Sequence, residues 1–201
     1  MYRFTEYLVA LAFIGSFPAV AMAQQAVPGD GSQDTMEMTG KAQENKKRGM
    51  DTEIYELTEE GTGDVMGSVK VRANPHGVLF VPELSGLTPG VHGFHLHENP
   101  DCGPSEKDGD TVPGGAAGGH YNPGGGGHNG PYQEGHKGDL PALYANQDGE
   151  VSVPVLAPRL MARDLHGRAL IIHQNGDNYS DDPKPLGGGG SRVACGIIGE
   201  K

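Results

Sequence analysis

The chain has 201 residues, a length that suits one domain with short appendages. Its formal net charge at pH 7 is −11, with 15 Lys and Arg residues against 26 Asp and Glu residues, so the composition argues against a nucleic-acid-binding protein. An acidic chain also repels anionic substrates, so it needs a local positive group if its substrate is an anion.

The first 23 residues have the features of a secretory signal peptide. Arg3 lies near the start, an apolar run extends from Leu8 to Ile14, and residues 21–23 supply a small-residue cleavage site. Ser16 and Pro18 interrupt the apolar stretch, which is too short for a good membrane span. We therefore expect an exported protein, periplasmic or otherwise outside the cytoplasm, with no stable membrane insertion after signal removal.

Residues 24–50 are rich in Gln, Gly, Lys, Glu and Met and show no apolar period. This composition predicts a flexible tether, followed by a domain over residues 51–201. Met36 and Met38 offer thioether donors to Cu(I), but a plain spacer is the simpler interpretation. The sequence does not reveal a role for the tether.

From Asp51 onward, short extended runs alternate with turn signals such as Asn74–Gly77 and Asn146–Gly149. A turn is also predicted at Gly61–Asp64, and a helical turn at Leu160–Leu165. Eight strands of this kind predict an all-β fold, a β-sandwich or flattened barrel. The strand candidates are Glu53–Leu57, Gly67–Ala73, Gly77–Val81, Val91–His97, Ala142–Ala145, Glu150–Leu156, Arg168–His173 and Arg192–Ile198.

Two long connections, at about 98–139 and 174–191, separate these strands and contain much of the chain's glycine. Loops of this length in a compact domain are usually functional. The first connection also holds Cys102, and the only other cysteine is Cys195. In an exported protein such a pair predicts a disulfide, which would restrain a loop that has little apolar content of its own.

Two histidines two residues apart point to a metal site. His95 and His97 lie in a predicted strand, so their side chains project from the same face. His95, His97, His120 and His173 could supply the imidazoles that Cu(II) favours. His120, His128, His136 and Asp139 could close a tetrahedral zinc site. Because His120 belongs to both sets, we hypothesise that it bridges two metals.

Four motifs in order resemble copper,zinc superoxide dismutase over about residues 51–200. They are Gly93–Glu98, Gly119–Pro123, Gly135–Leu140, and the glycine run Gly187–Gly190 followed by Ser191–Gly196. Asn99–Cys102 and Gly176–Asp181 resemble the bacterial periplasmic branch of that family. The resemblance implies an eight-stranded Greek-key β-sandwich or flattened barrel with two long functional loops.

The resemblance also implies both metal sites and the pairing of Cys102 with Cys195. It assigns Asp177 to an outer carboxylate that links a copper histidine to a zinc histidine, and Arg192 to an anion-guiding group that holds superoxide beside copper. Copper would cycle between Cu(II) and Cu(I), producing dioxygen and then hydrogen peroxide, and His120 would carry a proton. Zn(II) would be the structural and electrostatic partner.

Other basic and histidine residues have weaker interpretations. Lys107, Lys137 and Lys184 are candidates to extend the positive field around Arg192. His92 points away from His95 by strand parity, which favours a hydrogen-bonding role over metal ligation. His76 and His166 are expected to be solvated.

The alternative is a sandwich protein that binds copper or zinc without turnover, including a copper chaperone of similar fold. The complete ligand set together with Arg192 favours the enzyme, because a chaperone needs neither a closed zinc site nor an anion guide. The resemblance to the bacterial branch favours a homodimer, although monomers also occur in that branch.

Overall fold

The computed structural model describes residues 50–199. The predicted signal peptide and, except for Met50, the predicted tether lie outside these residues, as do Met36 and Met38. Within the described part, no helix has the length and apolar character needed to cross a membrane.

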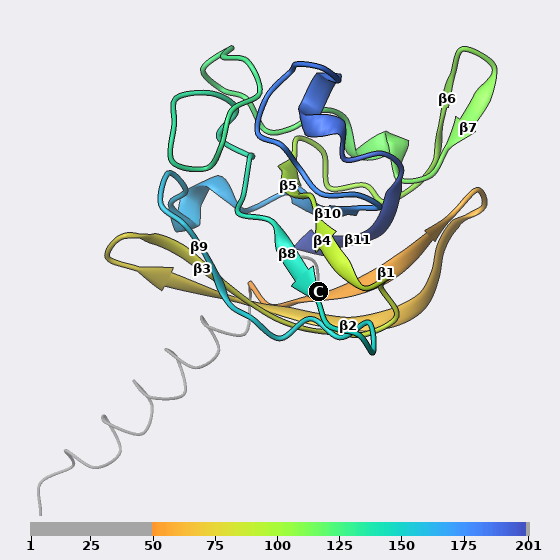
Figure 1. Cartoon of the computed structure of the whole chain (residues 1–201), viewed down its shortest axis with the longest axis horizontal. Helices are drawn as coiled ribbons and strands as arrows, with labels where there is room; N and C mark the ends of the chain where they lie inside the picture. Colours follow the sequence, from red (N-terminus) through yellow and green to blue (C-terminus); the bar gives the residue numbers. More distant parts are fainter. Residues whose placement is uncertain (1–49, 200–201) are drawn as a thin grey trace, which may run out of the picture.

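Most of the ordered backbone is one curled antiparallel sheet, which Figure 1 shows as an open half-barrel with long loops gathered above it. Seven strands pair in the order β5-β10-β11-β1-β2-β3-β9, and two further pairs, β4–β8 and β6–β7, stand outside it. The strands are β1 (Thr52–Thr58), β2 (Gly61–Asn74), β3 (Gly77–Leu84), β4 (Gly90–His92), β5 (Phe94–His97), β6 (Ser105–Lys107), β7 (Asp110–Val112), β8 (Leu143–Ala145), β9 (Val155–Ala157), β10 (Arg168–His173) and β11 (Arg192–Ile198). Three short 3-10 helices complete the fold: η1 (Gly115–Ala117), η2 (Ala162–Asp164) and η3 (Pro185–Gly188).

The all-β fold class is confirmed, and each of the eight predicted segments contains strand. The predicted strand Val91–His97 is divided at Gly93, giving β4 and β5. Gly93 itself has no ladder partner in either the β4–β8 pair or the β5–β10 pair. Its N–H donates to the Asn175 carbonyl at 2.8 Å, and its carbonyl accepts the His173 N–H at 2.9 Å.

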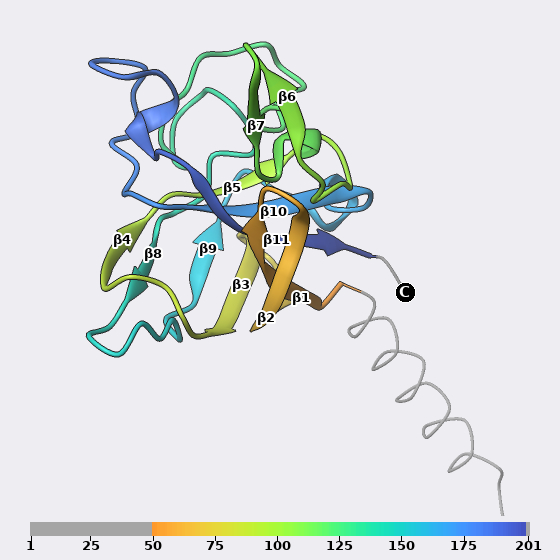
Figure 2. The ribbon, with the colours of Figure 1, turned by 90° about the vertical axis from the view of Figure 1, so that its right-hand side faces the viewer.

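The structure differs from the predicted elements in three places. Residues Gly61–Asp64 begin β2 instead of forming a turn, because Thr62 pairs with Leu57 and the chain reverses at residues 59–60. The segment Glu150–Leu156 keeps only a short strand at its end, since Pro154 lacks the N–H that a ladder needs. The hairpin β6–β7, which projects from the first long connection (Figure 2), was missed because its residues carry no apolar alternation.

Side-chain parity on β5 and β10 decides where the core and the loops lie. Phe94 and Leu96 on β5, with Leu170 and Ile172 on β10, belong to the main apolar core. The intervening residues face the opposite side, where Ile171 packs in a second cluster with both cysteines and Ala117 of the first long connection. Both faces of these strands are therefore covered, and all four residues of β5 are buried.

Candidate metal centre

Three histidines reach the loop side of the sheet from neighbouring strands. His95 and His97 stand on β5, and His173 ends β10. In the register of these strands, His95 lies opposite Ile171 and His97 opposite Ala169. All three histidines lie on the face opposite the core residues Leu96, Leu170 and Ile172, so their rings are buried beneath the loops.

The first long connection is joined to β5 by backbone hydrogen bonds around Leu96. The Tyr121 N–H donates to the Leu96 carbonyl at 2.7 Å, and the Leu96 N–H donates to the Gly138 carbonyl at 2.9 Å. These bonds place His120 beside His97 and Asp139 beside His95. A side chain at Gly138 would bring a Cβ within 2.2 Å of the Leu96 carbonyl oxygen, so the close approach requires glycine.

The side chains converge into two overlapping sets of possible ligand atoms, each set lying within 4.8 Å. The first contains His95, His97, His120 and His173, the predicted copper donors. The second contains His95, His120, His128 and Asp139, so it holds three of the four predicted zinc donors but not His136.

The contacts of His136 and His95 place His136 with the zinc donors. The His136 Nδ1 lies 3.3 Å from the Asp139 Oδ1, and its ring centroid lies 5.7 Å from that of His128. His95 reaches the second set because its ring stacks on His120 at 3.9 Å, but its Nε2 is hydrogen-bonded to Asp177 at 2.7 Å. We therefore retain His136 in the zinc set and His95 in the copper set.

Six of the histidines each have one buried ring nitrogen without a hydrogen-bond partner, as a metal ligand requires. An unsatisfied buried polar atom is costly, so six of them in one cluster need an explanation. These atoms are the Nδ1 of His95, His128 and His136, and the Nε2 of His97, His120 and His173. Coordination of two metal cations by these nitrogens would satisfy all six, so the residues fit a copper–zinc pair.

His120 lies between the two sets. Its Nδ1 is 2.9 Å from the Asp139 Oδ1, while its Nε2 is one of the unpartnered atoms. The two nitrogens of one ring thus face different groups of donors, as a bridging imidazole would.

Asp177 connects the two sets from the second long connection. Its Oδ2 lies 2.7 Å from the His95 Nε2, and its Oδ1 lies 2.8 Å from the His128 Nε2. Gly187 makes room for this carboxylate, because a Cβ there would fall 1.8 Å from the Asp177 Oδ1. Such a carboxylate orients both rings and leaves the opposite nitrogen of each for a metal.

Burial controls the protonation of the predicted copper donors. It lowers the pKa of His95 to about 3 and that of His173 to about 4, and it also lowers the pKa of His97. These imidazoles are therefore neutral at pH 7, which is the form that binds metal. For His128, burial is outweighed by the neighbouring carboxylates of Asp139 and Asp177, which raise its pKa to about 9 in the metal-free protein.

Arg192 supplies a positive group at the open side of the copper set. It lies opposite His173 across the β10–β11 pair, and its guanidinium donates to the carbonyls of Gly114 and Gly118. The Gly118 carbonyl also accepts from the His97 Nδ1 at 2.9 Å. A cavity of about 370 Å³ is lined by Arg192, Lys184, Asn175, His120, His173 and the glycine-rich residues 188–190. An anion entering this cavity would meet Arg192 next to two of the predicted copper donors, His120 and His173.

The three candidate lysines differ in their placement. Lys184 lines the cavity with Arg192. Lys137 instead forms an ion pair with Asp164 at 2.7 Å, which neutralises its charge. Lys107 lies on the exposed hairpin strand β6.

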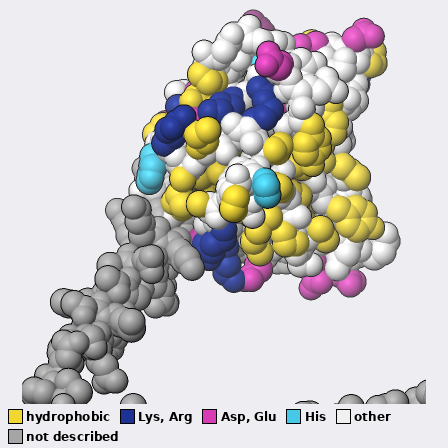
Figure 3. Space-filling view, turned by 90° about the vertical axis from the view of Figure 1, so that its left-hand side faces the viewer, with side chains coloured by type: hydrophobic (Ala, Val, Ile, Leu, Met, Phe, Trp, Pro, Cys, Tyr) yellow, Lys and Arg dark blue, Asp and Glu magenta, His cyan; other side chains and the backbone are white. Residues whose placement is uncertain are grey.

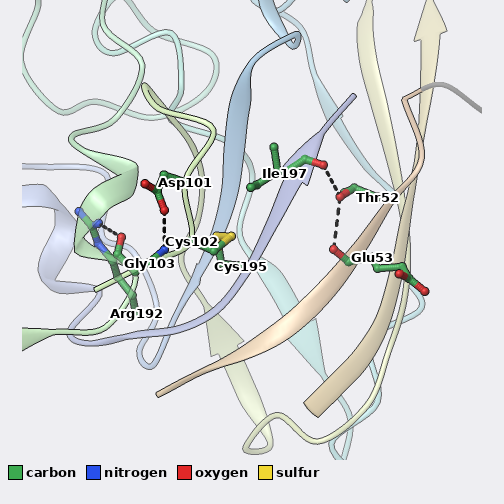
Figure 4. Close-up of a disulfide and its surroundings, with 9 residues drawn as sticks. Thr52, Glu53, Asp101, Cys102, Gly103, Arg192, Cys195 and Ile197 are labelled. Carbon is green, nitrogen blue, oxygen red and sulfur yellow. Dashed lines mark hydrogen bonds between the residues drawn. A yellow bond between two sulfur atoms is a disulfide. The ribbon is translucent and has the colours of Figure 1, made fainter. Parts of the chain in front are cut away.

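The predicted disulfide between Cys102 and Cys195 is present and ties the first long connection to β11 (Figure 4). Cys195 lies opposite Tyr55 of β1 and Ile171 of β10, three residues after Arg192. The bond therefore holds the loop that receives the guanidinium against the strand that carries it.

The remaining histidines lie apart from the centre. His92 is buried, with its ring nitrogens 2.8 Å and 2.7 Å from the backbone carbonyls of His173 and Thr88, which confirms a hydrogen-bonding role. His76 and His166 are exposed, as expected.

Several contacts around the centre were not foreseen from the sequence. Asp181 accepts the backbone N–H of the predicted zinc donor His128 at 3.0 Å. Arg159 donates to the carbonyl of His136, and Asp164 holds Lys137. Asp181 falls within a motif already noted for its resemblance, but nothing in the spacing of Arg159 and Asp164 indicates that they contact the segment around His136.

Comparison with known proteins identifies the family. A family model described as copper/zinc superoxide dismutase matches residues 65–198. The chain belongs to the copper/zinc superoxide dismutase family.

Relatives and solved structures support this membership. The superoxide dismutase [Cu-Zn] of Photobacterium leiognathi is 54% identical over 144 residues, covering 71% of this chain and 83% of the relative. The structure of the Cu/Zn superoxide dismutase from Brucella abortus matches with a TM-score of 0.73 and 52% identity, covering 74% of this chain and 97% of that chain. The monomeric enzyme from Salmonella enterica matches with a TM-score of 0.67 and 49% identity, covering 74% and 97%.

As a copper/zinc superoxide dismutase the chain is an oxidoreductase that acts on superoxide and uses copper and zinc. This family membership favours the enzyme over a metal carrier without turnover. The bacterial periplasmic branch predicted from the sequence agrees with these bacterial relatives.

Proposed function

We propose that the chain converts superoxide to dioxygen and hydrogen peroxide at the centre described above, with each ligand in a defined role. Copper would be held by His95, His97, His120 and His173, and zinc by His120, His128, His136 and Asp139. The observation that carries this assignment is the set of six buried ring nitrogens without partners. Two of these histidines, His120 and His173, line a cavity that also contains Arg192.

Bound copper supplies one-electron redox chemistry between Cu(II) and Cu(I), and zinc contributes charge and structure without redox chemistry of its own. The protein's task is to keep both sets of donors in place. Three histidines, His95, His97 and His173, come from the paired strands β5 and β10. Asp177 fixes the orientation of the His95 and His128 rings.

Arg192 is proposed to bind the substrate anion. Its guanidinium is half-buried and held by two carbonyls, so it keeps a fixed position at the cavity wall. A positive group is needed there because the molecule as a whole is strongly acidic. Superoxide dismutase is itself a known example of electrostatic steering, in which a local field raises the association rate.

His120 is proposed to hold a proton for the second half of the reaction. His120 lines the cavity, its Nε2 has no hydrogen-bond partner, and its Nδ1 faces Asp139. A proton carried at Nε2 can pass to the reduced oxygen species bound beside Arg192.

The experiment that tests this proposal measures metal content and superoxide decay in the purified, metal-loaded protein. A non-catalytic carrier would bind copper or zinc but leave the decay of superoxide at its uncatalysed rate.

Export to the periplasm is proposed from the N-terminal 23 residues and the tether that follows. Cell fractionation with N-terminal mass analysis tests it, and the expected mature protein begins at Gln24. A cytoplasmic protein that retains Met1 would contradict the proposal.

A homodimer is a further proposal, supported by exposed apolar residues outside the centre. Val91 on β4 lies opposite Tyr144 on β8, and these two residues are 53% and 52% exposed. Light scattering across a concentration series tests this assembly. A constant monomer mass would contradict it and would agree with the monomeric Salmonella enterica relative.

A further inference from the structure

The proposed copper and zinc ligands receive different support from the fold. His95, His97 and His173 stand on β5 and β10, whose backbones are paired in the large sheet. His128, His136 and Asp139 lie instead in the connection between β7 and β8, where the only regular element described is the short helix η1. Contacts other than a strand ladder must hold this part of the chain, which we call the zinc loop (residues 128–139).

Residues 158–168, which follow β9, contact the zinc loop on both sides of His136. The Arg159 guanidinium donates to the Gly135 carbonyl at 2.8 Å and to the His136 carbonyl at 3.1 Å. The Lys137 ammonium donates to the Asp164 Oδ2 at 2.7 Å. Figure 3, which views the molecule from the side of β3 and β9 in Figure 1, shows one group of Lys and Arg side chains on the upper part of this face and a separate group lower down.

Asp164 is itself held in place by its own turn. Its side chain is only 7% exposed, and its Oδ2 accepts the Met161 N–H at 2.8 Å, which caps η2. Although burial opposes ionisation, the hydrogen bonds from Lys137 and Met161 lower the pKa of Asp164, so it is an anion at neutral pH. The anchor for Lys137 is therefore fixed independently of the zinc loop.

The same segment also reaches residues next to copper donors. Arg168 donates from Nε to the Asp164 carbonyl at 2.8 Å and from Nη1 to the Glu98 carbonyl at 2.9 Å. Its guanidinium carbon lies 3.6 Å from the ring centroid of Tyr121. Glu98 and Tyr121 directly follow the donors His97 and His120, but those donors are already tied to the sheet by backbone bonds near Leu96.

We propose that Asp164 is a positioning residue for the zinc side of the centre, acting through Lys137 to hold His136 and Asp139 in place before the metal binds. A largely buried ion pair is a weak source of stability but fixes one arrangement of the groups it joins. The inference rests on the proposed function, because it takes His136 and Asp139 as zinc ligands. It adds the prediction that zinc affinity depends on Asp164 much more than copper affinity does.

The primary test is Asp164→Asn, which removes the charge but keeps an oxygen that can accept the Met161 N–H. Zn(II) and Cu(II) affinities of the metal-free protein are measured separately by competition with a chelator. Zinc affinity should fall about tenfold, and copper affinity should change much less. A tenfold loss is at the lower end of the range seen when a residue that hydrogen-bonds a metal ligand is replaced. Unchanged zinc affinity, or an equal loss for both metals, would overturn the inference.

Lys137 variants provide a second route that leaves the turn of Asp164 intact if Asp164→Asn does not fold. Lys137→Met should lower zinc affinity as Asp164→Asn does, and the double variant should be no worse than either single variant. Lys137→Arg should restore most of the affinity, because it keeps the charge and the donor. Additive losses in the double variant would show that the two residues do not act as a pair.

Glu83→Gln is the matched control, since it breaks an exposed Lys–carboxylate pair with Lys70 on β2 and β3, away from the zinc loop. Glu83→Gln should leave zinc affinity unchanged. If Glu83→Gln loses as much zinc affinity as Asp164→Asn, the effect of Asp164→Asn is general destabilisation and the inference fails. If the unmodified protein binds no zinc, the proposed ligand set fails. If the unmodified protein binds zinc and the Asp164 and Lys137 variants bind zinc with the same affinity, only the present inference fails.

Discussion

In the proposed assignment both metal sites depend on His120, whose Nδ1 faces Asp139 and whose Nε2 has no hydrogen-bond partner. His120→Ala should therefore lower the affinity for copper and for zinc together, whereas His173→Ala should mainly lower the affinity for copper. Metal analysis after dialysis against a weak chelator measures both. Loss of copper alone from His120→Ala would contradict the bridging assignment.

Arg192 acts on substrate approach in this account and not on metal binding. Arg192→Gln should leave the metal content unchanged and lower kcat/KM about tenfold at low ionic strength, at the lower end of the effects of electrostatic steering. The dependence of kcat/KM on salt should also weaken, since screening acts on the charge that has been removed.

Lys70→Gln is the control for this prediction, because it removes an equal charge from an exposed pair on β2. Stopped-flow measurement of superoxide decay over a salt series checks both variants. If Arg192→Gln turns over like the control, the positive field must come from another residue, with Lys184 in the cavity the first to examine.

At the scale of elements, alternating apolar residues predicted most of the strands, and the spacing of the histidines predicted the candidate metal ligands. Strand parity on β5 and the spacing of the loop histidines were enough to propose both ligand sets. The hairpin β6–β7 was missed because it is polar and short, and the break at Gly93 depends on a contact with Asn175 far along the chain. Asp164 and Arg159 were missed because a contact between distant loops leaves no periodic signal in one sequence.

The disulfide joins two elements that carry different parts of the centre. It closes a sequence separation of 93 residues between the first long connection and β11. Reduction should lower the free energy of unfolding by up to about 4 kcal/mol, since the unfolded chain regains the freedom of a long loop.

Denaturant unfolding of the oxidised and reduced proteins, with Cys102→Ser/Cys195→Ser as the control for side reactions of free thiols, measures this difference. Equal midpoints in the oxidised and reduced proteins would show that the loop is held by its other contacts alone. Thiol titration of the non-reduced protein should find none of the two cysteines free.

At the scale of the whole molecule, buried histidines make the metal-free protein sensitive to acid. Burial lowers the pKa of His95 to about 3 and that of His173 to about 4, against about 6.5 in an unfolded chain. Below pH 6.5 the unfolded state therefore binds more protons than the folded state, and stability falls as pH drops toward 4. His128, whose pKa is raised to about 9, acts in the opposite sense and loses its contribution as pH rises from 6.5 to 9.

The metal-free protein should thus have its highest stability near neutral pH, with a lower denaturant midpoint at pH 4.5 than at pH 7. Urea unfolding at a series of pH values measures this. A midpoint that rises between pH 7 and pH 4.5 would contradict the burial of neutral imidazoles.

The net charge of −11 makes the centre's local chemistry decisive, because the molecule as a whole repels superoxide. The purified protein should contain about one copper and one zinc per chain, and it should accelerate superoxide decay followed by stopped-flow absorbance. Protein that holds zinc at both sites after copper loading, or that holds both metals and leaves superoxide decay at its spontaneous rate, would contradict the account.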